Sequence, residues 1–426
     1  MVNIINKREN IHIIGLGVAE QAQLSDAALQ AVRVADLIIG TARQLNVLET
    51  ILAQSVSPEI CLLLPALSEL KALLNHYKDK TIVLLATGDP LYYGIGRWFT
   101  KNIDAQDLVF YPAISSVQAT CHELGLALQD VDVLSLHGRP LDKIRASLQA
   151  NQTLLVLTDK HSLPLVLADE CHAAGFENSQ LWVCENLGHS HQRIRQFSVR
   201  QLRKMTQFEV DPLHITVIKT SGVGGVQPTA PGIADHHFQT GKTAGTGMIS
   251  KREVRLTVLS MMQISNEDVI WDIGAGCGGV AVELARWNSR AVVYAVEQNK
   301  ERISLLKKNI DHFGVSSNCF PVLGRAPSAL LSLTMLTKAF IGGSDGELDS
   351  LLPQLWDLLP VNGVLVITSV TDKTRRTIEI FCRSGINVSI ECVELAVGRG
   401  ALTDEGFVFN QKRPVIVVKL LKQSVS

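Results

Sequence analysis

The stretch Val269-Ile270-Trp271-Asp272-Ile273-Gly274-Ala275-Gly276-Cys277-Gly278-Gly279 joins a short apolar run to a carboxylate and then to closely spaced glycines. The apolar run predicts a buried strand, and the glycines predict a tight turn whose backbone N–H groups can approach a ligand. The Ala- and Leu-rich segment 280–287 predicts the helix that follows. A strand, a glycine loop and a helix in this order indicate an α/β unit that binds a nucleotide-like ligand.

A second acidic residue extends this interpretation. Glu297 ends the apolar run 292–296, about twenty residues beyond the glycine loop. In a βαβ unit an acid at this position accepts hydrogen bonds from ribose hydroxyls. The sequence therefore predicts an adenosine-bearing cofactor.

Two such cofactors fit the glycine loop. Gly274, Gly276 and Gly279 satisfy the dinucleotide pattern G-x-G-x-x-G. Asp272, however, places negative charge where a pyrophosphate would be repelled and a sulfonium cation attracted. The β-rich runs 387–395 and 414–421 near the end of the chain also look like the hairpin of a class I methyltransferase sheet. We therefore favour S-adenosylmethionine over NAD, with a sheet that binds neither as a third alternative.

Length and composition limit the other classes of function. A chain of 426 residues with 46% apolar residues predicts two domains, and a net charge of −1 does not favour nucleic acid as a partner. Eight cysteines without a C-x-x-C pair predict reduced, mostly buried thiols and no metal site. The charged start of the chain predicts no export signal, and no apolar run is long enough to span a membrane. We expect a cytoplasmic protein.

Residues 11–220 alternate short apolar runs with amphipathic segments, which predicts a separate α/β domain. Three of its predicted strands end in distinctive loops, at Gly15-Leu16-Gly17, Gly88-Asp89-Pro90 and Tyr111-Pro112-Ala113-Ile114-Ser115-Ser116. A further strand leads into Ser135-Leu136-His137-Gly138-Arg139. Loops at the carboxyl ends of strands form the ligand-binding edge of open α/β sheets.

These loops resemble those of the tetrapyrrole methylase superfamily, and the Ser-Leu-His-Gly-Arg segment is similar to its corrin-pathway branch. The resemblance implies a second S-adenosylmethionine site. Its residues would be Gly88, Asp89, Pro90, Ser115 and Ser116, with Arg139 as a substrate-binding cation. The first loop departs from the family pattern, because Val18-Ala19-Glu20 stands where a proline or a further glycine is usual.

From 221 to 247 the chain is rich in Gly, Pro, Ser and Thr, which predicts a linker. His236 and His237 lie in it, and we interpret them as solvated side chains. The second domain then opens at 248, with Ser250 predicted as a helix N-cap and Glu253 as its capping-box partner. Two later loops, 323–330 and 339–344, carry glycines at predicted strand ends.

This second half is similar to the class I enzymes that methylate C15 of a corrin precursor and decarboxylate its C12 acetate. The motifs Ser-Lys-x-Glu-Val-Arg, Gly-x-Ala-Pro-x-Ala-Leu and Phe-Ile-Gly-Gly-Ser carry the resemblance together with the glycine loop. It implies substrate contacts at Arg255, Gly342 and Gly343. The cofactor residues predicted for this half are Ser250, Asp272, Gly274, Ala275, Gly276, Cys277, Gly278, Glu297, Gly324 and Ala326.

Taken together, the chain resembles the family of fused precorrin-6Y C5,15-methyltransferases (decarboxylating) of cobalamin biosynthesis. The expected organisation is a C5-methylating domain at 1–220, a linker at 221–247 and a C15-methylating domain at 248–426, with one cofactor per domain. Arg139, Lys251, Arg255 and Arg399 are candidate partners for the substrate carboxylates. The sequence identifies no general base, and the resemblance implies a homo-oligomer.

Rival interpretations are a ribosomal RNA or diphthine-type methyltransferase, an NAD-linked tetrapyrrole oxidoreductase, and a tetrapyrrole carrier without activity.

Overall fold

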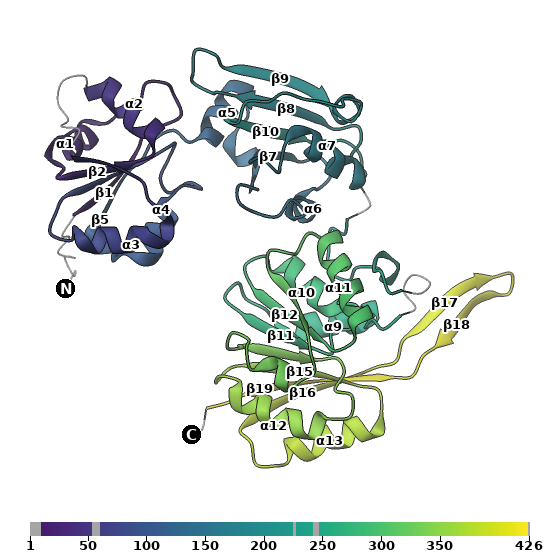
Figure 1. The fold of residues 1–426 in the computed structure, drawn as a ribbon. Coiled ribbons are helices and arrows are strands. Elements are labelled where there is room, and N and C mark those ends of the chain that lie inside the picture. The colour runs from purple at the N-terminus through teal and green to yellow at the C-terminus, as the bar shows by residue number, and fades with distance from the viewer. Residues whose placement is uncertain (1–9, 53–59, 225–226, 242–246, 425–426) are drawn as a thin grey trace. The chain divides into compact units, whose positions relative to one another are not determined.

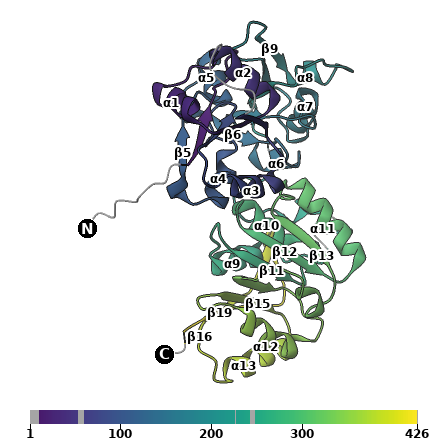
Figure 2. The same ribbon diagram turned by 60° about the vertical axis from the view of Figure 1, so that its left-hand side comes forward.

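The structure is a computed structural model that describes residues 10–52, 60–224, 227–241 and 247–424. The chain divides into two compact units, which are described separately (Figures 1 and 2). Unit 1 comprises Met1–Gly138 and Gln149–Gly224, and unit 2 comprises Arg139–Leu148 and Gly225–Ser426. The start of the chain, where no export signal was predicted, lies outside the described residues.

Unit 1 begins with a fully parallel sheet of five strands in the order β3-β2-β4-β1-β5. Every residue of β2 and β4 is buried, which explains why these strands appear in the sequence as continuous apolar runs. The strands are β1 (Ile11–Gly15), β2 (Leu37–Gly40), β3 (Cys61–Leu63), β4 (Ile82–Ala86) and β5 (Leu108–Tyr111). The helices are α1 (Asp26–Val34), α2 (Ala42–Leu52), α3 (Leu67–His76) and α4 (Gly96–Asn102).

A second, mixed sheet completes unit 1, in the order β6-β7-β10-β8-β9. Only the β6–β7 pair is parallel among its described pairs. Helix α5 (Ser116–Leu124) packs Val117 and Cys121 against this sheet. The strands are β6 (Asp132–Ser135), β7 (Thr153–Leu157), β8 (Gln180–Glu185), β9 (Arg193–Ser198) and β10 (His214–Lys219), with helices α7 (Pro164–Ala173) and α8 (Val199–Leu202).

Unit 2 is built on a seven-stranded sheet in the order β13-β12-β11-β14-β15-β19-β16. Five parallel strands are followed by β19, which pairs antiparallel with both β15 and β16. The predicted α/β class, with an antiparallel pair ending a parallel sheet, is confirmed. The strands are β11 (Val269–Ile273), β12 (Val292–Glu297), β13 (Cys319–Leu323), β14 (Lys338–Ile341), β15 (Val364–Ser369), β16 (Val388–Leu395) and β19 (Val415–Lys422).

Helices cover both faces of this sheet, as the two views show (Figures 1 and 2). One core packs α9, α10 and α11 against one face, and the other packs α12 and α13 against the opposite face. The helices are α9 (Arg252–Met262), α10 (Gly279–Trp287), α11 (Lys300–His312), α12 (Leu348–Leu358) and α13 (Asp372–Cys382), with the short α6 (Lys143–Ser147) also grouped here.

A separate two-stranded hairpin, β17 (Gly398–Thr403) and β18 (Gly406–Gln411), projects from unit 2 (Figure 1). Leu402 pairs with Phe407 and Gly400 with Phe409, so that Leu402, Phe407 and Phe409 share one face of the ribbon. All three side chains are exposed. This arm was not predicted from the sequence.

The stretch expected as a linker contributes to the core of unit 2. Ile233 and Phe238 are 2% and 1% exposed and belong to the same core as α9, α10 and α11. Asp235 starts a short 3₁₀ turn, Asp235–His237, and is also buried. From Gly225 onward the described part of this stretch therefore differs from the expected linker, whereas 225–226 and 242–246 lie outside the described residues.

All eight cysteines are unpaired, as expected, and five of them are buried. Among the described residues, no helix is long and apolar enough to cross a membrane.

Candidate functional site

The glycine loop after β11 has a backbone that only glycine adopts without strain. Gly274, Gly276 and Gly278 have φ angles of +74°, +60° and +88°. A Cβ atom on Gly274 would lie 2.4 Å from the Gly343 carbonyl oxygen, and one on Gly276 would lie 2.6 Å from that of Met248. The loop is therefore packed closely against two other backbone segments.

Glu297 fixes this loop from the end of β12. Its Oε2 accepts a hydrogen bond from the Gly276 N–H at 2.9 Å, and its Oε1 accepts one from the Asn299 N–H at 2.9 Å. The side chain is buried, yet it borders the pocket above the loop. A carboxylate held by two backbone donors keeps further lone pairs for a ligand.

A pocket of about 490 Å³ opens beside the loop. Its volume lies in the range of small-molecule sites. Nine of the residues predicted for unit 2 line it: Ser250, Gly274, Ala275, Gly276, Glu297, Gly324, Ala326, Gly342 and Gly343.

Cys277 and Gly278 belong to the glycine loop but do not line the pocket. Cys277 is 1% exposed and its carbonyl accepts from Asn309, while Gly278 is the N-cap of α10.

Asp272 was predicted to face the cofactor, but it does not line the pocket. Its side chain is fully buried, and neither carboxylate oxygen has a hydrogen-bond partner among the described residues. Burial raises the pKa of Asp272 to about 7, although the nearby Ala281 backbone N–H opposes this shift. Asp272 can therefore act on a ligand only through its charge, from beneath the loop.

The start of α9 differs from the prediction in two respects. Lys251, not Ser250, is the N-cap, and its side chain makes no capping hydrogen bond. The Arg252 N–H instead donates to Asp235 Oδ1 at 3.0 Å, so a carboxylate from the expected linker caps the helix.

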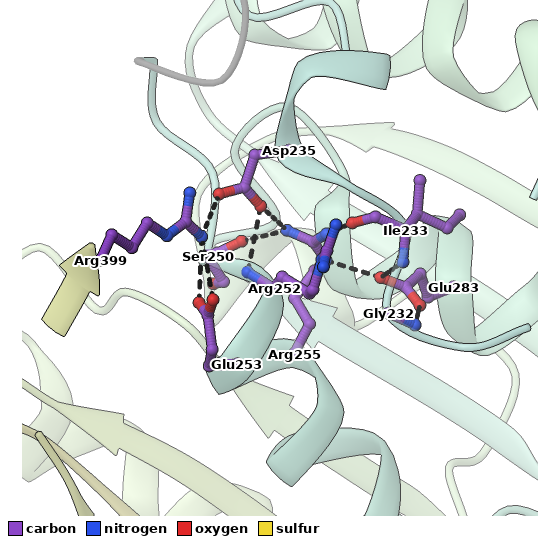
Figure 3. A network of polar contacts seen from close by, with 9 residues as sticks. All are labelled: Gly232, Ile233, Asp235, Ser250, Arg252, Glu253, Arg255, Glu283 and Arg399. Atoms are coloured by element: carbon purple, nitrogen blue, oxygen red, sulfur yellow. Dashed lines mark hydrogen bonds and ion pairs between the residues drawn. The ribbon is translucent and has the colours of Figure 1, made fainter. Parts of the chain in front are cut away.

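The substrate-binding role expected of Arg255 is also revised. Its side chain is fully buried and forms ion pairs with Asp235 (2.8 Å) and Glu283 (2.7 Å) (Figure 3). Its guanidinium lies over the Phe238 ring and does not border the pocket.

Several residues of the pocket were not among the site residues predicted from the sequence. Arg302, Arg325 and Asp345 line the pocket, and Asp345 accepts from the Gln298 amide at 2.7 Å. All three lie shortly after the carboxyl ends of strands, and that position was the available signal. Lys251, proposed from sequence only as a carboxylate partner, also lines the pocket.

In unit 1 the Gly-Asp-Pro loop meets the first glycine loop at the carboxyl edge of the first sheet. The Gly88 N–H donates to the Gly17 carbonyl at 2.8 Å, and Gly88 has a φ of +66°. Asp89 Oδ1 accepts from the backbone N–H groups of Leu91 (2.8 Å) and Tyr92 (3.1 Å). Asp89 thus shapes its own turn, while Pro90 is buried.

Ser115 and Ser116 open helix α5 at the neighbouring loop. The Ser115 hydroxyl accepts from the Gln118 N–H, and the Gln118 side chain accepts from the Ser115 N–H, which forms a capping box. Ser116 is the first residue of the helix. The loop lies close to Gly88, since a Cβ atom there would be 3.4 Å from Ser115 Cα. Arg139, half-buried in the loop after β6, is grouped with unit 2.

Within the described ranges no group of three or more His, Cys, Asp or Glu side chains could hold a metal ion.

Comparisons with known proteins match both halves of the chain. The family model for tetrapyrrole (corrin/porphyrin) methylases matches residues 10–203, and the model for the precorrin methyltransferase domain matches residues 243–420. A curated Sinorhizobium protein named precorrin-6Y C(5,15)-methyltransferase [decarboxylating] is 31% identical over 362 residues, covering 84% of each chain.

Two further similarities involve part of the chain. A Methanothermobacter thermautotrophicus protein named probable cobalt-precorrin-6B C(15)-methyltransferase (decarboxylating) is 33% identical over 166 residues, covering 39% of this chain and 85% of that one. A Geobacter metallireducens crystal structure described as precorrin-6Y C5,15-methyltransferase is 29% identical, covers 46% of this chain and 99% of that one, and has a TM-score of 0.40.

Proposed function

The chain belongs to the precorrin-6Y C(5,15)-methyltransferase (decarboxylating) family, and from that premise we propose how its two units share the reaction. The protein is a methyltransferase that acts on a precorrin in cobalamin biosynthesis. We assign methylation at C5 to unit 1, and methylation at C15 with loss of the acetate carboxyl to unit 2. The separate family matches of the two halves support this division.

We further propose one S-adenosylmethionine site per unit. In unit 2 the donor would occupy the pocket of about 490 Å³, against the backbone of Gly274 and Gly276 and beside Glu297. The close backbone packing that leaves no room for Cβ atoms on this loop supports the assignment. Asp272, buried beneath the loop, would attract the positive sulfur through its field.

In unit 1 the proposed donor site is the meeting point of the three strand-end loops. Gly88, Asp89 and Pro90 would shape one side, and Ser115 and Ser116 the other. The backbone contact between Gly17 and Gly88 supports a single site formed by these loops.

The protein's main task in each unit is positioning. The donor supplies an activated methyl group, and the nucleophilic ring carbon has to be held about 3 to 3.5 Å from it in line with the departing sulfur. Gly342 and Gly343 border the pocket, and a Cβ on Gly343 would meet nothing within 4 Å, so a flat macrocycle can approach the backbone there. Lys251 in the pocket wall and Arg139 are the proposed partners for substrate carboxylates.

We propose that the protein self-associates through the hairpin β17–β18. Leu402, Phe407 and Phe409 expose 73%, 72% and 62% of their surface on one face of a two-stranded ribbon. An isolated ribbon is only marginally stable in water, and an exposed apolar patch indicates a contact surface.

The overall reaction and the number of donor sites are tested with methyl-¹³C donor and a metal-free precorrin-6Y substrate. The expected result is two new methyl signals in the product spectrum, one lost carboxyl group, and two moles of donor bound per chain by calorimetry. Binding of one mole per chain, or displacement of the donor by NAD, would contradict the proposal.

A further inference from the structure

The Arg255 side chain of unit 2 is fully buried, which is rare for a guanidinium. Figure 3 shows how its donors are used. Nε donates to Glu283 Oε1 at 2.7 Å, and Nη1 donates to Asp235 Oδ1 at 2.8 Å and to the Ser250 carbonyl at 2.5 Å. Nη2 donates to the Ile233 carbonyl.

The acid partners of Arg255 connect it to two segments that lie apart in the sequence. The Glu283 carboxylate accepts from the backbone N–H groups of Gly232 (2.7 Å) and Ile233 (3.2 Å). Asp235 Oδ2 accepts from Arg399 at 2.9 Å, at the start of the hairpin strand β17. Burial opposes ionisation of Asp235, yet Arg255 and Arg399 outweigh it and hold its pKa below the usual value.

These contacts end on the wall of the pocket. Met248, Ile249, Ser250 and Lys251 line it, and this segment is held at two points. Arg255 binds the Ser250 carbonyl, and the Cys277 N–H in the glycine loop donates to the Met248 carbonyl at 3.1 Å. Asp235 also caps α9 at the next residues, through the Arg252 N–H.

We propose that Arg255 and Asp235 are positioning residues for the methyl donor of unit 2. They fix the backbone of the segment 248–251, which for this purpose we call the donor wall, at the distance from the glycine loop that the donor requires. This inference rests on the proposed assignment of the pocket to the donor.

Energetics favour a positioning role over a purely stabilising one. A buried ion pair is expensive to desolvate, and well-packed apolar residues of similar volume often stabilise a core equally well or better. An apolar side chain, however, could not donate a hydrogen bond to the Ser250 carbonyl. The ion pairs with Asp235 and Glu283 orient the planar Arg255 guanidinium for that hydrogen bond. Directional contacts of this kind fix a backbone to within tenths of an ångström, which apolar packing alone does not ensure.

The test compares full-length variants under conditions in which both methylations are followed in one assay. Asp235→Asn retains an acceptor for the Arg252 N–H but removes the charge that directs Arg255. Arg255→Lys retains the charge but loses the planar donor set. Each variant is expected to raise the donor KM for C15 methylation by about tenfold or more, with a smaller change in kcat, because the wall is displaced from the donor. C5 methylation in the same chain is expected to stay unchanged.

Glu253→Gln is the matched control. Glu253 pairs with Arg399 at 3.0 Å and so belongs to the same charge network, but in the described part of the chain its side chain forms no hydrogen bond or ion pair with the donor wall. Its donor KM is expected to stay within about twofold of the wild-type value.

The outcomes separate the inference from the proposed function. Wild-type donor KM in both network variants, or a loss of C15 methylation by kcat alone, would overturn the positioning role. Absence of C15 product from the wild-type chain would instead overturn the assignment of the unit. Should Arg255→Lys fail to fold, Arg399→Gln removes only the half-exposed partner of Asp235 and is expected to raise the donor KM by about threefold.

Discussion

At the scale of single residues, Gly276 is the position where the loop tolerates least change. Its N–H donates to Glu297, and a Cβ atom would lie 2.6 Å from the Met248 carbonyl oxygen at a φ of +60°. Gly276→Ala is therefore expected to displace the donor wall and to reduce C15 methylation by about a hundredfold or more. Product analysis by mass spectrometry measures this, with C5 methylation as the internal reference.

Gly343→Ala serves as the comparison, because a Cβ there meets no protein atom within 4 Å. It should fold as well as wild type and raise the KM of the macrocycle rather than of the donor. Wild-type C15 methylation in Gly276→Ala would show that the loop does not hold the donor.

The raised pKa of the buried Asp272 leads us to expect that the stability of unit 2 depends on pH. Its folded pKa of about 7 lies above the ordinary value of 3.8, so the folded state retains a proton that the unfolded state has lost. Stability consequently falls as the pH rises from the ordinary value to about 7, and is constant above that. Between about pH 5 and about pH 8 the wild-type unit should lose about 2 to 3 kcal/mol more than Asp272→Asn.

Hydrogen exchange of peptides that cover β11 measures this difference locally, which avoids the two-unit unfolding transition. Equal pH slopes in the two proteins would contradict the raised pKa.

Single residues were predicted correctly where their position at the end of a strand determined their place in the site. Glu297 and the glycines were placed in the pocket because strand-end spacing fixes their positions. Arg255 was wrongly expected to meet substrate, since its partners Asp235 and Glu283 are distant in the sequence and one lies in a Gly- and Pro-rich stretch. Serine is a common N-cap residue, but at the start of α9 Asp235 rather than Ser250 supplies the oxygen that accepts from the Arg252 N–H.

At the scale of elements, the hairpin gives a prediction about assembly. Replacing Phe407 and Phe409 by Ser removes most of its apolar face without touching either core of unit 2. The double variant should sediment as a smaller species than wild type while keeping its C15 activity per folded chain.

Ile380→Ser is the control, because Ile380 on α13 is equally exposed, at 71%, but lies outside the hairpin. Unchanged sedimentation of the Phe407/Phe409 variant would contradict self-association through this arm.

Elements were predictable where periodicity was strong. The apolar run ahead of the glycine loop is the strand β11, the run 292–296 lies in β12, and the segment 280–287 lies in α10. The hairpin was not predicted because its strands are exposed on both faces. Their sequences therefore lack the alternation of apolar and polar residues that identifies a half-buried strand.

At the scale of the whole molecule, we expect the intact protein to form the doubly methylated product faster than separated sites would, because both sites lie on one chain. Asp89→Ala removes the turn that Asp89 holds in unit 1, and Gly276→Ala disables unit 2, so each variant should lose a different methyl group. An equimolar mixture of the two full-length variants should make the doubly methylated product more slowly than wild type. At micromolar concentration the intermediate has to diffuse between chains, whereas within one chain its effective concentration is about millimolar.

Stopped assays with quantification of the singly methylated intermediate measure this difference. Equal rates for the mixture and the wild type would show that joining the units gives no kinetic advantage.

The burial of Ile233, Asp235 and Phe238 has a practical consequence for anyone who wishes to divide this protein. A cut just ahead of Met248, where the composition is typical of a linker, would remove Asp235, one of the two carboxylates paired with the buried Arg255, and would leave Glu283 as its remaining acid partner. A fragment that contains unit 2 alone therefore has to start upstream of Gly232, whose N–H donates to Glu283. The boundary lies earlier in the chain than the Gly- and Pro-rich composition of 221–247 suggests.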